Sequence, residues 1–276
     1  MRAQGFGLTI AVALLAASCT TSPDPPVSFV VGLRVLAGQG QPPEVAPGAV
    51  SQVSLLVVDT GGLPVDVSWS RCTLAPHTGE AVNPDCVKGG GPPALEPLGA
   101  GTSIAFTMPQ VTAAELGAPD ATNGVYVPLV AKVSDGASAV TAVYRLRLGG
   151  AAPPNMNPAI ANIDVVDAAG AATPIDPATP LGVSAGQKIT LSATLAPGSA
   201  ETYTAINGMS KTEMITVSWF CTAGALSVEK TSASQPQTVL DLSKNPPIVG
   251  GNVDLFAVAH DERGGVGYTH VVLELH

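Results

Sequence analysis

The chain carries Val65-Asp66-Val67-Ser68-Trp69 in its first half and Ile215-Thr216-Val217-Ser218-Trp219 in its second half. Apolar and polar residues alternate along both segments, which is the pattern of a half-buried β-strand. Each segment ends in one of the chain's two tryptophans, and a cysteine follows at close range. The match indicates that one β-rich unit occurs twice in the chain.

Three further landmarks recur in the same order in both halves. They are a glycine turn before a strand, a strand that runs into an Asp/Gly turn, and a final alternating strand. The pairs are residues 45–48 with 183–186, residues 130–136 with 257–264, and residues 140–148 with 266–275. Between the halves, residues 150–157 are rich in Ala, Pro and Asn and predict a linker. We therefore expect two domains, at residues 27–149 and 158–276.

The strand pattern predicts the fold class. The expected strands are short and alternate with a period of two, and turn residues recur about every ten positions, which is typical of β-sandwiches. We expect an all-β chain of two tandem antiparallel sandwiches. The one helix expected lies at residues 112–116, where Thr112 and Glu115 have the spacing of a capping box.

Both halves resemble bacterial immunoglobulin-like modules of the polycystic-kidney-disease or cadherin-like kind. The resemblance rests on the Pro-Gly or Ala-Gly entry to the second strand, on Trp69 and Trp219, and on the turns at residues 135–136 and 261–265. It implies two tandem immunoglobulin-like sandwiches. Antibody-type domains pin their sheets with a disulfide between strands B and F, and neither strand carries a cysteine here. We therefore expect the tryptophans to hold the sheets together by packing.

The composition is that of a folded chain with an acidic surface. Of 276 residues, 46% are hydrophobic and 12% are charged, which is the reverse of a disordered composition. The formal net charge is −9 and aromatic residues make up 4%. Because such a surface repels phosphate groups, we expect no nucleic acid partner and no electrostatic docking on a membrane.

The N-terminus resembles a bacterial lipoprotein signal peptide. Arg2 precedes an apolar stretch at residues 6–17 that is too short to span a bilayer, and small residues lead to Cys19. The resemblance implies removal of residues 1–18, acylation of Cys19 and a membrane tether at residues 19–26. Thr20 stands where an aspartate favours retention at the inner membrane, which implies the outer membrane, on its periplasmic or surface face. The alternative is an ordinary secretory signal with Cys19 incidental.

The remaining cysteines fit an oxidising compartment. Cys72 and Cys86 bracket a loop rich in Pro, Gly and Asn, and we expect a disulfide between them. Cys221 shares strand parity with Trp219 and should point inward as a buried free thiol, with an intermolecular bridge as the alternative. No CxxC or HxxxH pair accompanies them, which disfavours zinc.

Several acidic residues and histidines invite a metal-site interpretation. In the last strand His270, Glu274 and His276 share one face and would point outward. Cadherin-like modules bind calcium through carboxylates near strand ends. The calcium candidates are Asp135, Asp164, Asp167, Asp261 and Glu262. The ligand clusters typical of such sites are absent from the sequence, so we expect turns and solvated faces here, with no metal and no other cofactor.

Residues 182–186 match the G-x-S-x-G pattern of a hydrolase nucleophile, with Ser184 at its centre. That pattern requires a strand before the serine and a helix after it, whereas a turn precedes and a strand follows here. We therefore expect a turn at the entry to a strand, and no catalytic residue.

The expected function is that of a lipid-anchored, non-catalytic binding or structural module at a bacterial surface. The short tether would hold the first sandwich near the membrane, with the second pointing away. A protein or carbohydrate ligand would bind loops at one end of a sandwich, and the insertion at residues 72–101 is the first candidate. The alternatives are an accessory subunit of a secretion or polysaccharide complex, and a secreted hydrolase using Ser184.

Overall fold

The structure is a computed structural model that describes residues 26–77, 80–88, 94–111, 116–149, 153–245 and 251–276. The expected signal peptide, Cys19 and most of the tether lie outside these ranges, as do Thr112 and Glu115 of the expected helix. The helix that the structure does describe is α1 (Pro84–Val87), which Asn83 caps by accepting a hydrogen bond from the Asp85 N–H. No helix in the described ranges is long and apolar enough to cross a membrane.

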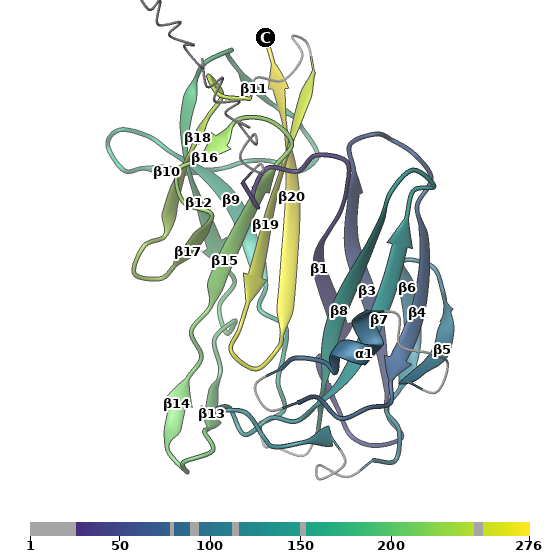
Figure 1. The fold of residues 1–276 in the computed structure, drawn as a ribbon. Helices are drawn as coiled ribbons and strands as arrows, with labels where there is room; N and C mark the ends of the chain where they lie inside the picture. The colour runs from purple at the N-terminus through teal and green to yellow at the C-terminus, as the bar shows by residue number, and fades with distance from the viewer. Residues whose placement is uncertain (1–25, 78–79, 89–93, 112–115, 150–152, 246–250) are drawn as a thin grey trace, which may run out of the picture.

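The first half of the chain forms a sandwich of two sheets (Figure 1). One sheet has the strand order β1-β3-β6 and the other has the order β2-β8-β7-β4-β5. All neighbours pair antiparallel except β2 and β8, which run parallel. The strands are β1 (Leu33–Gln41), β2 (Glu44–Val45), β3 (Val50–Asp59), β4 (Asp66–Cys72), β5 (Leu95–Ala100), β6 (Ser103–Thr107), β7 (Tyr126–Ser134) and β8 (Ala139–Leu148).

The second half repeats this plan with sheets ordered β10-β9-β12-β18-β16 and β11-β20-β19-β15-β17, and a separate hairpin of β13 and β14. The strand β11 runs parallel to β20, as β2 does to β8. The strands are β9 (Ile160–Val166), β10 (Ala172–Pro174), β11 (Leu181–Val183), β12 (Lys188–Leu195), β13 (Thr202–Thr204), β14 (Ser210–Thr212), β15 (Thr216–Cys221), β16 (Ala225–Leu226), β17 (Lys230–Ser232), β18 (Gln237–Asp241), β19 (Asn252–His260) and β20 (Val266–Leu275). Two tandem immunoglobulin-like sandwiches are thereby confirmed.

Each tryptophan lies at the centre of one core. Trp69 on β4 is 1% exposed and Trp219 on β15 is 0% exposed. Their indole N–H groups donate to the Gly101 carbonyl and to the Thr231 hydroxyl, at 2.9 Å in both cases. The indoles therefore fill the space between the sheets with their polar atoms satisfied, as expected from the sequence.

The disulfide between Cys72 and Cys86 is confirmed, with a Cα–Cα distance of 5.7 Å. It ties the end of β4 to α1. Cys221 is a buried free thiol, and burial raises its pKa to about 12. A thiol held in its protonated form is a poor nucleophile, so Cys221 acts as a small apolar side chain of the core.

The two sandwiches pack side by side (Figure 1). Leu36 and Val30 contact Phe256 of β19, and Ala37 contacts Val258 and Val266. The chain before β1 also joins the second sandwich, because the Val30 N–H donates to the Cys221 carbonyl and the Cys221 N–H donates to the Ser28 carbonyl. The start of the first sandwich therefore lies beside the second one, and the expectation that the second sandwich points away from the membrane stays a prediction.

Candidate functional site

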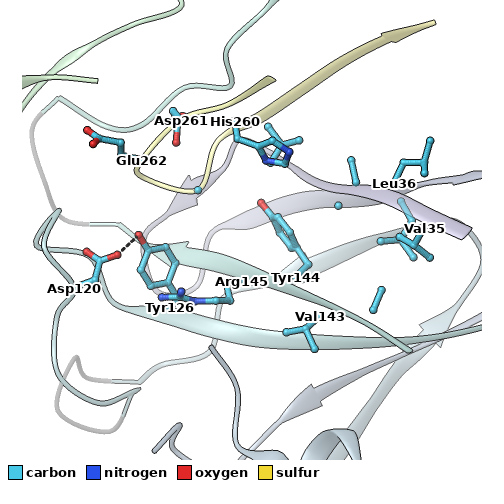
Figure 2. Close-up of a pocket in the computed structure, with 16 residues that line it drawn as sticks. Val35, Leu36, Asp120, Tyr126, Val143, Tyr144, Arg145, His260, Asp261 and Glu262 are labelled. Carbon is cyan, nitrogen blue, oxygen red and sulfur yellow. Dashed lines mark hydrogen bonds between the residues drawn. The ribbon is translucent and has the colours of Figure 1, made fainter. Parts of the chain in front are cut away.

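A groove of about 440 Å³ lies where the two sandwiches meet (Figure 2). One wall is the β1 segment 35–38, and a second wall is the β8 segment 142–145. The turn between β19 and β20 covers one end with His260, Asp261 and Glu262. Loops at an end of a sandwich were the expected location of a binding surface, whereas this groove is built from strand edges of one domain and a turn of the other.

Tyr126 and Asp120 form the covered end of the groove. The Tyr126 hydroxyl donates to an Asp120 carboxylate oxygen at 2.9 Å, as Figure 2 shows. The guanidinium of Arg145 stacks on the Tyr126 ring, 4.0 Å from its centre. Burial opposes ionisation of Asp120, but hydrogen bonds from Thr122, Gly124 and Tyr126 together lower the pKa of its carboxyl. The Asp120 carboxylate is therefore ionised and fully hydrogen-bonded, and it holds the Tyr126 side chain in place.

Tyr144 is the buried polar residue of the groove. Its side chain is 7% exposed, and its hydroxyl has no hydrogen-bond partner of ordinary geometry among the described residues. In Figure 2 the hydroxyl points toward the turn that carries His260 and Asp261. Burial raises the pKa of Tyr144, so its O–H remains available as a donor. Burial, with a contribution from Lys230, lowers the pKa of His260, which favours the neutral imidazole.

A buried ionic cluster lies behind this end of the groove and joins the domains. Arg147 of β8 and Arg263 of the β19–β20 turn each lie 3.2 Å from one oxygen of Glu44. Arg263 also lies 3.4 Å from Glu201 and 3.5 Å from Glu213. The side chains of Glu44, Glu213 and Arg263 are at most 1% exposed. Since buried charges require partners, these ion pairs hold the two sandwiches in one arrangement.

Carboxylates outnumber guanidinium groups in this cluster. Burial is the main reason that the pKa of Glu213 rises to about 7, and the neighbouring Asp261 and Glu201 add to the rise while Arg263 opposes it. Burial also raises the pKa of Asp261. Proton uptake by Glu213 therefore relieves repulsion among the carboxylates.

We expect this cluster to make stability depend on pH. A carboxyl whose pKa is raised in the folded state gives its full contribution below its ordinary pKa of 4.5 and loses it as pH rises through about 7. Replacing Glu213 with Gln should therefore stabilise the chain at pH 8 and have a much smaller effect at pH 5. Urea midpoints between pH 5 and pH 8 measure this. Glu96→Gln at an exposed ion pair is the control, and parallel profiles for wild type and Glu213→Gln would contradict the expectation.

The acidic residues that the sequence offered for calcium are engaged in local structure. Asp135 accepts from the N–H groups of Ala137 and Ser138, which is an ordinary turn. The others accept likewise: Asp164 from Thr194, Asp167 from Ala169 and Ala171, Asp261 from Arg263, Gly265 and Asn155, and Glu262 from Tyr203 and Lys211. In the described part of the chain, no three His, Cys, Asp or Glu side chains are grouped to hold a metal ion.

The histidines of the last strand are not brought together with Glu274. His270 pairs with Asp254 at 2.8 Å and stacks on Phe256 with ring centres 4.5 Å apart. Glu274 is exposed, and the His276 N–H donates to the Val183 carbonyl at the far end of β20. The predicted alternation is confirmed, because Val271, Leu273 and Leu275 lie in the core.

Ser184 lies in the turn at the entry to β12, as expected, but the strand β11 directly precedes it, where the sequence predicted a turn. The Ser184 N–H donates to the Gln187 side chain at 2.8 Å, and Gly186 in the same turn has a φ of +75°. A strand, not a helix, follows. The helix that must follow a G-x-S-x-G nucleophile is therefore missing.

The insertion at residues 72–101 is partly described. It holds the disulfide, α1 and β5, and Ala94 packs against Cys86 and Val130 in a small cluster. Residues 78–79 and the glycine-proline stretch 89–93 lie outside the described ranges. A ligand site on this insertion stays a prediction.

No protein-family model and no curated protein matches this sequence. Among solved structures, the chain is similar to the three N-terminal domains of Hoc, the highly immunogenic outer capsid protein of bacteriophage RB49, with 12% identity and a TM-score of 0.25 over 89% of this chain and 70% of that chain. It is also similar to the two tandem V-type regions of VCBP3, a v-region-containing chitin binding protein, with 14% identity and a TM-score of 0.28 over 87% of this chain and 99% of that chain.

Proposed function

We propose that the mature chain is a lipid-anchored, non-catalytic binding module of a bacterial cell envelope. The observation that carries the binding role is the groove between the domains, which a buried ionic cluster holds in one arrangement. Ligand sites are concave and largely pre-formed, and they occur preferentially between domains. The surroundings of Ser184 support the non-catalytic part of the proposal, because the strand β12 stands where an elbow has a helix.

The anchor rests on the sequence. Arg2, the short apolar stretch and the small residues before Cys19 support cleavage and acylation, and Thr20 supports placement at the outer membrane. Two or more acyl chains would hold the protein on the membrane without help from its acidic surface.

We expect Cys19→Ala to move the protein from the membrane fraction to the soluble fraction. Intact mass spectrometry of the wild type should give a chain that begins at Cys19 and carries acyl chains. Cys221→Ala is the matched control, since it removes a buried thiol and leaves the anchor. A wild-type protein that is soluble and free of lipid would refute the anchor.

A further inference from the structure

Among the described residues, most of the β8 edge that faces the groove has no hydrogen-bonded neighbour, although β1 contacts Tyr144 at Gly38. The strand has ten residues, and β7 pairs with it from Ala139 to Arg147 on one side. On the other side β2 pairs only with Arg147 and Leu148. The stretch from Ala139 to Arg145 is therefore open along that side.

The hydrogen bonds at the end of β8 show which backbone groups face the open side. The N–H groups of Arg147 and Gly149 donate to Pro43 and Val45 on the β2 side, whereas the Leu148 N–H donates to Val125 on the β7 side. Backbone groups alternate in direction along a strand, and no register shift interrupts the β7–β8 ladder. The N–H and C=O groups of Thr141, Val143 and Arg145 therefore point to the open side, where Val143 and Arg145 line the groove.

This edge lacks the features that usually prevent strand addition. Residues 139–145 read Ala-Val-Thr-Ala-Val-Tyr-Arg, with no lysine and no proline; the one charged residue, Arg145, stacks on Tyr126, and Val143 is 37% exposed. Edge strands are ordinarily blunted by lysine, proline, a bulge or a covering loop. An unprotected edge beside a pre-formed groove is suited to pairing with an added strand.

The groove has room for one extended chain. Four strand residues, 142–145, span roughly 13 Å. Spread over that length, the cavity of about 440 Å³ is too narrow for a second sheet. The β19–β20 turn closes the end, because a Cβ added at Gly264 would lie 3.4 Å from the Tyr126 ring and 3.9 Å from the Arg145 carbonyl.

We propose that the groove binds an extended peptide segment of a partner protein, which adds as a strand to the open edge of β8. Its backbone pairs with Thr141, Val143 and Arg145, and one of its carbonyls accepts from the unpaired Tyr144 hydroxyl. Val35, Leu36 and Leu55 line the opposite side, so alternate side chains of the peptide are small and apolar. This inference rests on the proposed binding role and names the partner's chemistry.

Val143→Pro tests the proposal, because proline removes an N–H that faces the groove and spares those that face β7. The matched control is Val143→Thr, which keeps the N–H, and Tyr144→Phe removes only the hydroxyl. The probe is a phage-displayed heptapeptide library panned on the full chain. Unchanged melting temperature and a Cys221 thiol that stays protected show that each variant folds.

We expect synthetic versions of the selected peptides to bind wild type and Val143→Thr equally, Tyr144→Phe several-fold more weakly, and Val143→Pro at least tenfold more weakly. Bound peptide should slow amide exchange at Thr141, Val143 and Arg145. Equal binding to Val143→Pro, or a library that yields no such peptide, overturns the proposal. A dimer in sedimentation that Val143→Pro abolishes also overturns it, since the occupant would be a second copy. Because acylation of Cys19 is measured separately, a failed panning experiment leaves the anchor in place.

Discussion

Replacing Arg263 with Met should lower the free energy of unfolding by about 3–5 kcal/mol, the cost of removing one partner from a buried ion pair. The guanidinium of Arg263 is fully buried and is shared by Glu44, Glu201 and Glu213, and it donates to the Pro153 carbonyl at 2.9 Å. Methionine fills the volume but leaves two fully buried carboxylates with one cation fewer. Urea unfolding of the full chain at pH 7 measures the loss.

A matched control separates this effect from a general loss of charge. Arg71→Met breaks the pair with Glu96, whose side chains are 23% and 52% exposed, and should cost about 0–1 kcal/mol. The Arg263→Met deficit should also shrink at lower pH, since protonation of Glu213, whose pKa is raised to about 7, removes one negative charge from the cluster. A deficit for Arg263→Met no larger than that of Arg71→Met would show that the ionic cluster does not stabilise the fold.

The parts of the fold that follow from local pattern could be predicted from the sequence. Period-two alternation places Trp69 and Trp219 in the cores, and the paired cysteines of one loop form the disulfide. Helix α1 was missed although Asn83-Pro84 is a recognisable start, with a capping side chain followed by proline at the first helical position.

The interface and the groove could not be predicted from local pattern. Glu44, Arg147, Glu213 and Arg263 come from four separate segments, and a charged residue at a strand end looks the same in sequence whether it faces water or another domain. One feature of the sequence does indicate an interface. The run Leu255-Phe256-Ala257-Val258-Ala259 in β19 is apolar on both faces, which indicates a strand that is covered on both sides.

The packing of β19 on both of its faces couples the unfolding of the two domains. Phe256 and Val258 pack on the first sandwich, while Leu255 and Ala257 pack in the core of the second. Because β19 packs on both sides, a substitution that loosens the core of the second sandwich also weakens its packing on the first. The buried ions add to this coupling, because separating the domains would leave charged groups without their partners.

Replacing Trp219 with Ala should therefore destabilise both domains together. The direct loss is about 3–5 kcal/mol for a buried aromatic, with the Thr231 hydroxyl left unpaired as well. Trp69 is then the one tryptophan in the chain, so its fluorescence reports the first sandwich while far-ultraviolet circular dichroism reports both. We expect the two signals to shift to lower urea and to coincide.

Trp69→Ala is the reciprocal variant, in which Trp219 reports the second sandwich. Coincident transitions in both variants would mean that the interface makes the two sandwiches one cooperative unit, with the groove as a fixed feature of it. If Trp69 fluorescence in Trp219→Ala kept the wild-type midpoint while half of the circular dichroism signal was lost earlier, the domains would be independent. The groove would then open whenever they separate, and the edge of β8 would offer its backbone to larger partners than a single strand.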